Sequence, residues 1–354
     1  MTDIVNDKIE YPIKGEIYSV ERLEEYAAYL ATELKLSDNP KISQPLLPRM
    51  RENGVKLLVS YRALTEAIHR KDSLPPAAEW LTDNFHIVED QLREIQEDLP
   101  PAFYKELPKI ALGELTGYPR IYAIALALIA HTDSYLEPET IRRFVHAYQK
   151  ISPLNIGELW ALAITLRLVL VENLRRIAIR IVVDHEQRNE ANKFADQLFE
   201  AVEDKIKFQA LVSELPLGHR STVQDDRAYV AQIAKRLRDQ EPELWPALEH
   251  LEKYLAKKNS STEQVIDLSH QLQATSQVTV ANIITSMRLI SGLNWRDFFE
   301  SLSLVDRVLE KDLIYGKMDF LTRDRYRHVI EKISKRTHVS EIEIAEYAVQ
   351  LSKT

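Results

Sequence analysis

The sequence predicts an all-α protein, a multi-helix array or bundle with no sheet of consequence. Apolar residues recur every three or four positions along several segments, which is typical of amphipathic helices. The chain of 354 residues contains only 8 Gly, and its 15 Pro stand mostly at segment edges, as expected for helices joined by short connections. A segment that begins near residue 156 is apolar nearly all round, which predicts a central buried helix.

Composition limits the possible functions. Hydrophobic residues make up 45% of the chain, which is enough for a packed core, and the absence of Cys excludes disulfides and thiolate chemistry. A net charge of −8 argues against a general binder of nucleic acid or anionic membranes. The longest apolar runs reach about a dozen residues, whereas a membrane span needs roughly 20. With no signal peptide visible, we expect a soluble, cytoplasmic chain without a transmembrane segment.

The helical segments can be placed in order along the chain. The first covers 20–36, a proline-containing connector follows at 39–48, and the second helix covers 49–70. Pro75-Pro76 opens a third, because proline is tolerated in a first turn, and Pro100-Pro101 ends it. Its buried stripe is Leu81, Phe85, Val88, Leu92 and Ile95. Shorter helices are expected around 102–112, 118–132 and 138–150.

Capping boxes mark three further helix starts. Asn155 with Glu158 opens the longest helix, which we expect to run to about residue 210. Ser260 with Glu263 follows a polar break at 257–259, and Ser340 with Glu343 opens the last helix. From these breaks we predict an N-terminal helix and connector (1–44), a main helical domain (45–257) and a C-terminal helical subdomain (260–354).

The predicted central helix carries a thin polar stripe. Its members are Glu158, Thr165, Glu172, Arg176 and Arg180. Glu172 and Arg176 are four residues apart and could pair within the helix. Arg167 points away from the stripe, and a buried guanidinium needs a carboxylate or carbonyls from another element. The candidate partners are Asp83, Glu89 and Asp133. A structural ion pair is the favoured interpretation, and a site for an anionic ligand is the alternative.

Other constellations give weak indications of chemistry. Glu79, Asp83, His86 and Asp90 share a helical face and could bind a metal, but a solvated face is the simpler interpretation. The arginines at 323, 325 and 327 alternate, so we interpret them as inter-helix pairs and surface charge, not as a nucleic-acid site. No glycine-rich phosphate loop and no Asp-x-Asp motif occurs. The residues alone therefore predict no catalytic, cofactor or metal site.

Eight ordered blocks between residues 45 and 350 carry a family resemblance. They include Pro76–His86, Leu99–Pro108, Gly117–Tyr122, His131–Ser134, Gly157–Ala161, Val171–Arg176, Asn294–Glu300 and Met318–His328. Together they resemble the N-terminal cytoplasmic region of cyclic β-1,2-glucan synthases, which are large bacterial inner-membrane glycosyltransferases of the family 84 type. Members of that family continue with transmembrane helices, a transferase domain that uses UDP-glucose and a phosphorylase-like domain.

The resemblance implies an accessory role. This sequence lacks the Asp-x-Asp and Gln-x-x-Arg-Trp motifs of the transferase, so no catalytic residue or cofactor carries over. We expect a fragment or split-gene product that supports glucan synthesis at the inner face of the bacterial inner membrane. Its partner would be the membrane and transferase remainder, in cis or in trans. An exposed apolar patch would mark the surface where that remainder packs.

Two alternatives remain open. A free-standing helical interaction scaffold would have a well-covered surface. An enzyme with an unrecognised site would need a concave pocket in which buried charges converge. The residues of such a polar pocket, or of a buried charge network, would be Asp83, Asn84, Tyr118, Arg120, His131, Asp133, Glu158, Arg167, Glu172 and Arg176.

Overall fold

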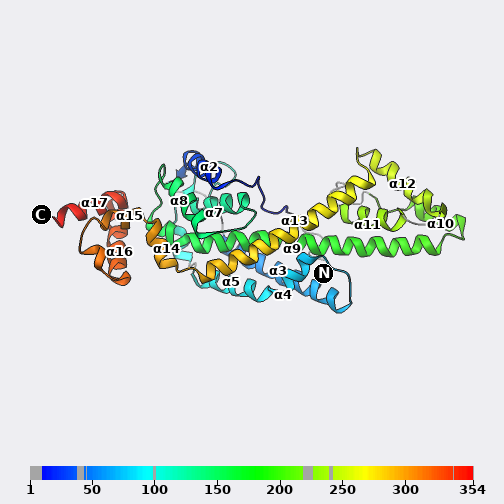
Figure 1. Cartoon of the computed structure of the whole chain (residues 1–354), viewed down its shortest axis with the longest axis horizontal. Helices are drawn as coiled ribbons and strands as arrows, with labels where there is room; N and C mark the ends of the chain where they lie inside the picture. Colours follow the sequence, from blue (N-terminus) through cyan, green and yellow to red (C-terminus); the bar gives the residue numbers. More distant parts are fainter. Residues whose placement is uncertain are drawn as a thin grey trace. The chain divides into compact units, whose positions relative to one another are not determined.

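The computed structural model describes residues 10–37, 44, 46–98, 101–217, 226–238, 242–337 and 339–353. In this part of the chain, nearly all regular structure is helical (Figure 1), so the predicted all-α class is confirmed. The sheet consists of two short antiparallel strands, β1 (Leu36–Ser37) and β2 (Lys109–Ile110), with Leu36 opposite Ile110.

The helices follow one another with short connections. Their order is α2 (Val20–Glu33), α3 (Leu46–His69), α4 (Pro76–Asp83), α5 (Phe85–Asp98), α6 (Pro101–Glu106), α7 (Arg120–His131), α8 (Pro138–Gln149), α9 (Ile156–Glu200), α10 (Lys205–Ser213), α11 (Arg227–Arg238), η1 (Pro242–Leu244), α12 (Trp245–Ala256), α13 (Thr262–Gly292), α14 (Trp295–Leu302), α15 (Leu304–Leu309), η2 (Tyr315–Lys317), α16 (Phe320–Thr337) and α17 (Glu341–Leu351).

The helices form two compact units. Unit 1 combines residues 1–11, 55–85 and 174–281, and unit 2 combines residues 12–54, 86–173 and 282–354. The long helices α3, α9 and α13 each contribute residues to both units. The consecutive division into 1–44, 45–257 and 260–354 stays a prediction. The polar break at 257–259 does separate α12 from α13, and both of these helices contribute residues to unit 1.

The single helix predicted between Pro75-Pro76 and Pro100 is divided into α4 and α5. Asn84 ends α4, since its backbone N–H and its side-chain Nδ2 both donate to the carbonyl of Trp80, at 3.2 and 2.9 Å. A side chain that satisfies a helix-end carbonyl stabilises the helix terminus. Leu99 and Pro100, like residues 39–43 and 45 of the predicted connector, lie outside the described residues.

Two of the three predicted capping boxes are confirmed. Asn155 Oδ1 accepts from the N–H of Glu158 at 2.8 Å while the Glu158 carboxylate accepts from the N–H of Asn155 at 3.0 Å. The box at the start of α17, Ser340 with Glu343, also closes in both directions. The third prediction is wrong by one residue. Ser261 and Gln264 make the reciprocal bonds, because the turn at 257–260 continues one position further than expected.

The core of unit 2 surrounds the first half of α9. Leu162, Leu166, Val169 and Leu170 are almost completely buried, which confirms the predicted central buried helix. Helix α7 is also buried along most of its length, and α2 packs on both α7 and α8. Helices that are apolar nearly all round belong in the middle of a packed domain.

The core of unit 1 forms around the second half of α9. Ala191 and Ala195 of α9 belong to one buried apolar cluster with Val230 of α11 and Leu251 of α12. Helix α9 ends at Glu200, and α10 then begins at a separate cap, where Asp204 accepts from two backbone N–H groups. The predicted end near 210 therefore lies within α10.

Candidate functional site

A buried ion pair fixes the N-terminus of α9 in unit 2. Arg120 and Glu158 are 4% and 0% exposed, and Arg120 Nε donates to Glu158 Oε1 at 2.7 Å while Nη2 donates to Oε2. The guanidinium also donates to Ser152 Oγ at 2.7 Å and to the carbonyl of Pro153 at 3.0 Å. These bonds join the start of α7 to the start of α9 and to the segment that precedes α9, so the charge cluster positions the helix.

A second buried cluster surrounds Glu172. Its carboxylate is paired with Arg49, and Tyr122 Oη donates to it at 3.1 Å. Arg49 also donates to Tyr118 Oη at 2.9 Å, and the rings of Tyr118 and Tyr122 stack at 4.9 Å. Burial and the Glu172 carboxylate raise the pKa of Tyr122. Glu172 thus binds partners on α3 and α7. Its pairing with Arg176 within α9 stays a prediction.

Arg167 forms the structural ion pair that was the favoured interpretation of this residue. Its Nη2 lies 2.6 Å from Glu94 Oε2, and its Nε donates to Gln91 Oε1 at 3.1 Å. Both of these partners lie on α5. The predicted partners Asp83, Glu89 and Asp133 include neither of them, so that prediction is wrong. Glu89 lies on the correct helix, but it is on the exposed face, one and a half turns from Glu94.

Two other candidate residues anchor the N-terminal segment of unit 2. The His131 ring stacks on Tyr18 at 4.1 Å, and its Nδ1 lies 2.7 Å from the carbonyl oxygen of Glu16. Asp133 adopts a positive φ of 49° in the turn after α7, and its carboxylate lies 3.6 Å from Lys14 Nζ. Both residues bind the segment before α2 to the helical core.

The remaining candidates lie in unit 1. Asp83 is exposed, and Asn84 caps α4. Arg176 pairs with Glu10 at 3.1 Å and donates to the carbonyl of Tyr11 at 2.9 Å. The ten residues thus belong to several separate clusters in two units. The face made by Glu79, Asp83, His86 and Asp90 is exposed, and within the described ranges no group of three or more His, Asp or Glu side chains could hold a metal ion.

An aromatic cleft of about 460 Å³ opens beside Arg167. Its walls come from α9, α14 and the segment around Phe103, and they include Trp160, Trp295 and Phe299. Trp160 and Phe299 stack with ring centroids 4.5 Å apart, and the Trp295 indole donates to the carbonyl of Ile290 at 2.7 Å. The cleft is mainly apolar, and Arg167 is the one charged residue among those that line it.

The C-terminal helices are held by a buried arginine. Arg327 on α16 is fully buried, and its Nη1 donates to Asp306 at 2.9 Å and to Glu300 at 3.0 Å. The guanidinium also lies over the rings of Phe299 and Phe320, at 5.2 and 4.7 Å. Arg323 pairs with Glu300 at 3.1 Å. The interpretation of these arginines as inter-helix pairs is therefore confirmed for positions 323 and 327.

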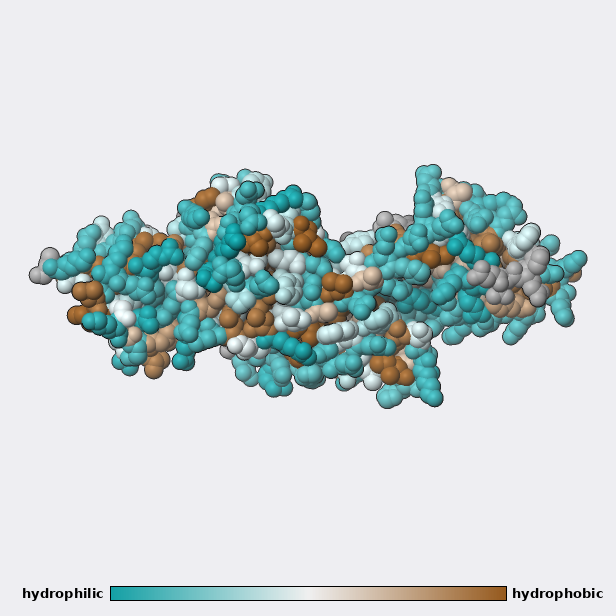
Figure 2. All heavy atoms as spheres, in the orientation of Figure 1, coloured by the Kyte–Doolittle hydropathy of each residue, from teal (hydrophilic) through white to brown (hydrophobic). Residues whose placement is uncertain are grey.

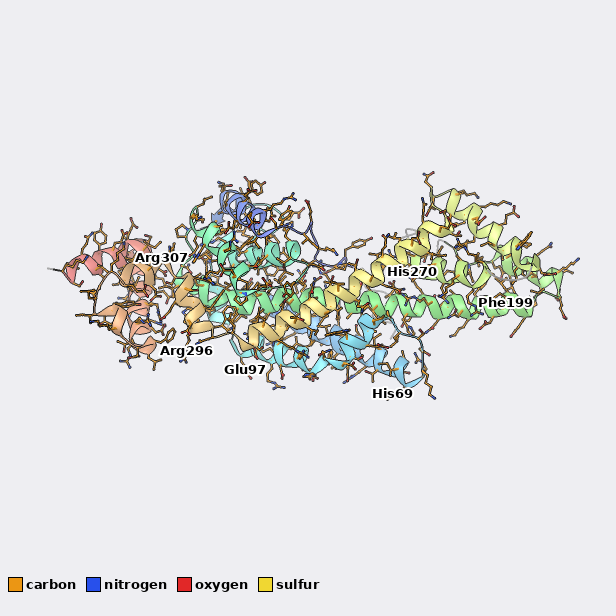
Figure 3. The ribbon with its side chains drawn as sticks, in the orientation of Figure 1. His69, Glu97, Phe199, His270, Arg296 and Arg307 are labelled. Carbon is orange, nitrogen blue, oxygen red and sulfur yellow. The ribbon has the colours of Figure 1, made fainter. Side chains whose placement is uncertain are left out.

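The same C-terminal helices expose many large apolar side chains, and we call this set the C-terminal apolar surface. Figure 2 shows small groups of brown atoms among hydrophilic ones over this part of unit 2, and Figure 3 shows the helices of this part, next to Arg296 and Arg307. Its members are Leu313, Ile314, Leu321, Tyr326, Val329, Ile333, Tyr347 and Leu351. Leu321, Val329 and Ile333 are separated by eight and four residues, which places them on one face of α16. Contiguous exposed apolar surface is typical of interaction sites.

No protein-family model matches this chain. The cyclic beta-(1,2)-glucan synthase NdvB of Rhizobium meliloti (strain 1021) is 36% identical over 303 residues, which is 86% of this chain. The matching region is 10% of that relative, so the chain spans about one tenth of the length of the curated protein it matches. The resemblance inferred from the eight sequence blocks is thus confirmed. Among the described residues, no helix is both long and apolar enough to cross a membrane.

Proposed function

We propose that this chain is an accessory, non-catalytic part of a bacterial cyclic β-1,2-glucan synthase. It supports glucan synthesis from UDP-glucose by packing on the membrane and transferase parts of the enzyme at the inner face of the inner membrane. The remainder of the synthase is its partner, in cis or in trans.

The match to the glucan synthase carries this proposal. An identity of 36% over 303 residues, reached without a matching family model, links nearly the whole chain to one kind of enzyme. In that relative, the matching region is one tenth of a much longer polypeptide. The remaining nine tenths offer surfaces against which such a region can pack.

The C-terminal apolar surface supports packing against a partner. Leu313 and Leu351 are 83% and 74% exposed, and Leu321 is 65% exposed. Burying these side chains against a partner would stabilise the complex by about 25 cal/mol for each Å² of apolar surface removed from water. A scaffold that works alone is expected to cover such residues, whereas a region that packs on a synthase leaves them available to the rest of the enzyme.

The paired state of the buried charges supports a non-catalytic role. Glu158 and Glu172 are bound by Arg120 and Arg49, and Arg167 is bound by Glu94. A catalytic acid, base or anion-stabilising group needs a free polar atom that faces substrate. In unit 2, these charges instead hold helices in register.

The proposal is tested by reconstituting glucan synthesis. The membrane and transferase remainder from the same genome is expressed alone, with this chain, or with a Leu321→Glu/Val329→Glu variant, and membranes are assayed for β-1,2-glucan formed from UDP-glucose. We expect the wild-type chain to raise synthesis and the variant to lose that effect. Equal synthesis with and without the wild-type chain would refute the accessory role.

A further inference from the structure

Unit 1 contains a polar cavity of about 530 Å³ that sequence analysis did not find. Four segments line it: the connection between α3 and α4, the second half of α9, α11 and the first half of α13. The volume is within the range of small-molecule sites, which extends from about 300 to 1,000 Å³. All lining residues belong to unit 1, so the cavity is complete within that unit.

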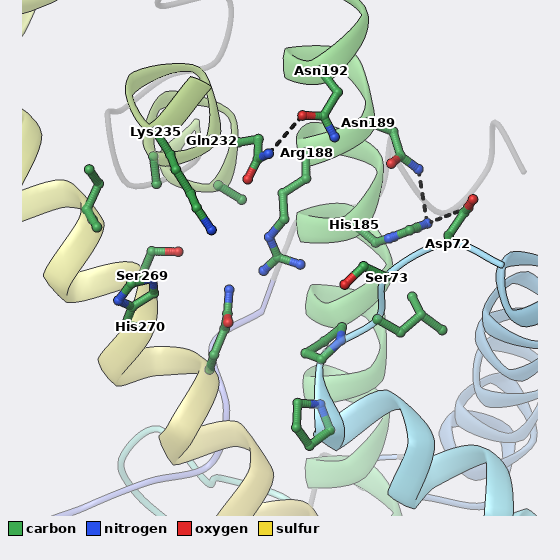
Figure 4. Close-up of a pocket in the computed structure, with 17 residues that line it drawn as sticks. Asp72, Ser73, His185, Arg188, Asn189, Asn192, Gln232, Lys235, Ser269 and His270 are labelled. Carbon is green, nitrogen blue, oxygen red and sulfur yellow. Dashed lines mark hydrogen bonds and ion pairs between the residues drawn. The ribbon is translucent and has the colours of Figure 1, made fainter. Parts of the chain in front are cut away.

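Basic side chains from three helices extend into this cavity. Figure 4 shows Arg188 from α9 and Lys235 from α11 directed into the same space, with His270 of α13 on the opposite side. Two amide side chains, Asn192 and Gln232, lie at one side of this space and are joined by a hydrogen bond of 2.8 Å. Basic groups and amide donors thus converge from elements far apart in the sequence.

The cavity has little negative charge to balance these groups. Asp72 is the one carboxylate among the lining residues, and it is already bound by Arg70 at 3.2 Å and by His185 at 3.1 Å. Within the residues that the structure describes, neither Arg188 nor Lys235 has a hydrogen-bond or ion-pair partner. Burial lowers the pKa of Arg188, although Asp184 nearby opposes the shift. A half-buried guanidinium in this state would gain from an anion.

The lining also indicates the class of anion. A guanidinium presents a fork of donors that matches the oxygens of phosphate, and an ammonium adds a second point charge. No Phe, Tyr or Trp is among the lining residues, so a nucleobase would find no aromatic ring on which to stack. The chemistry therefore favours a compact phosphate-bearing molecule over a nucleotide.

We infer that this cavity of unit 1 binds a small phosphate-bearing anion, with Arg188 and Lys235 as the residues that hold the phosphate. Asn192 and Gln232 supply neutral hydrogen-bonding groups at the side of the same site. This site and the C-terminal apolar surface share no residue. A result that refutes phosphate binding would therefore leave the proposed accessory role intact, and a result that refutes the accessory role would leave phosphate binding intact.

Isothermal titration calorimetry of the full chain tests this site with inorganic phosphate, pyrophosphate, glucose 6-phosphate, glucose and citrate. The variants are Arg188→Gln, Lys235→Gln and Lys207→Gln. Lys207 is the matched control, because it is an exposed lysine of α10 in the same unit and outside the cavity. Circular dichroism verifies folding, and Arg188→Gln should fold, since it removes an unpaired half-buried charge.

We expect the wild-type chain and Lys207→Gln to bind pyrophosphate or glucose 6-phosphate, and glucose not to bind. Each substitution in the cavity should weaken binding by about tenfold or more, the loss expected for one charge-assisted hydrogen bond. Unchanged affinity in folded Arg188→Gln and Lys235→Gln would overturn the assignment. So would the absence of binding to any phosphate compound, or citrate binding more tightly than all of them.

Discussion

Replacing Glu158 by Gln should destabilise unit 2 strongly, because it leaves the Arg120 guanidinium buried without a counter-charge. Glu158 is completely buried and Arg120 is 4% exposed. Removing one member of a buried pair costs about 3–5 kcal/mol. The amide also weakens the capping box with Asn155, although one oxygen remains to accept a bond. We therefore expect Glu158→Gln to lower the free energy of unfolding by about 3 kcal/mol or more.

Urea unfolding followed by circular dichroism at 222 nm measures this loss. For an m-value of about 3 kcal/mol per M, the midpoint should fall by roughly 1 M. Adding Arg120→Met should recover most of the loss, since the unpaired charge is then gone. Glu139→Gln is the matched control, because it removes an exposed pair with Arg142 and should cost under about 0.5 kcal/mol. A cost for Glu158→Gln no larger than that of the control would refute the reasoning.

Three further changes test other parts of the structure. Burial raises the pKa of Glu341 from 4.5 to about 7, so the folded state holds this proton more tightly; the resulting stability is complete below about pH 4.5 and is lost as the pH rises through 7. This loss of stability is about 3 kcal/mol. Glu341→Gln lacks the titrating carboxyl, so the difference in its free energy of unfolding between pH 5 and pH 8, measured with urea, should be smaller than the wild-type difference by that amount. Arg327→Met should cost about 3 kcal/mol or more by leaving buried carboxylates unpaired, whereas exposed Arg325→Met should stay within about 0.5 kcal/mol in the same unfolding measurement. Asn155→Ala should lower the melting temperature through a loss of about 1 kcal/mol, and an unchanged value would show that the cap is dispensable.

Local signals in the sequence were sufficient for the fold class and for most helix starts. Asn155 with Glu158 and Ser340 with Glu343 form their boxes as expected, because each box depends on residues three positions apart. The box near 260 was misplaced by one residue, since neighbouring serines offered two registers. The split at Asn84 was missed because the apolar stripe continues across it and its side-chain cap has no periodic signature.

Contacts between distant segments could not be predicted in the same way. Periodicity showed that Arg167 needs a partner on another helix, but choosing Glu94 over Glu89 requires the rotation of α5 about its axis. The unit 1 cavity depends on bringing Asp72, Arg188, Lys235 and His270 together from four segments. Each of these residues alone resembles an ordinary surface charge. The exposed apolar residues Leu321, Val329 and Ile333 of α16 were not singled out from the sequence, because the sequence does not show which helical faces are covered.

Association of this chain with the rest of a glucan synthase is the most direct test of the account. The detergent-solubilised membrane and transferase remainder is immobilised, and retention of wild-type chain, Leu321→Glu/Val329→Glu and Ile206→Glu is measured. Ile206 is the control, because it is an exposed apolar residue on α10 in unit 1. The account predicts that wild type and Ile206→Glu are retained and that the double variant is lost. Retention of all three to the same extent would contradict the role of the C-terminal apolar surface, and retention of none would contradict the accessory function itself.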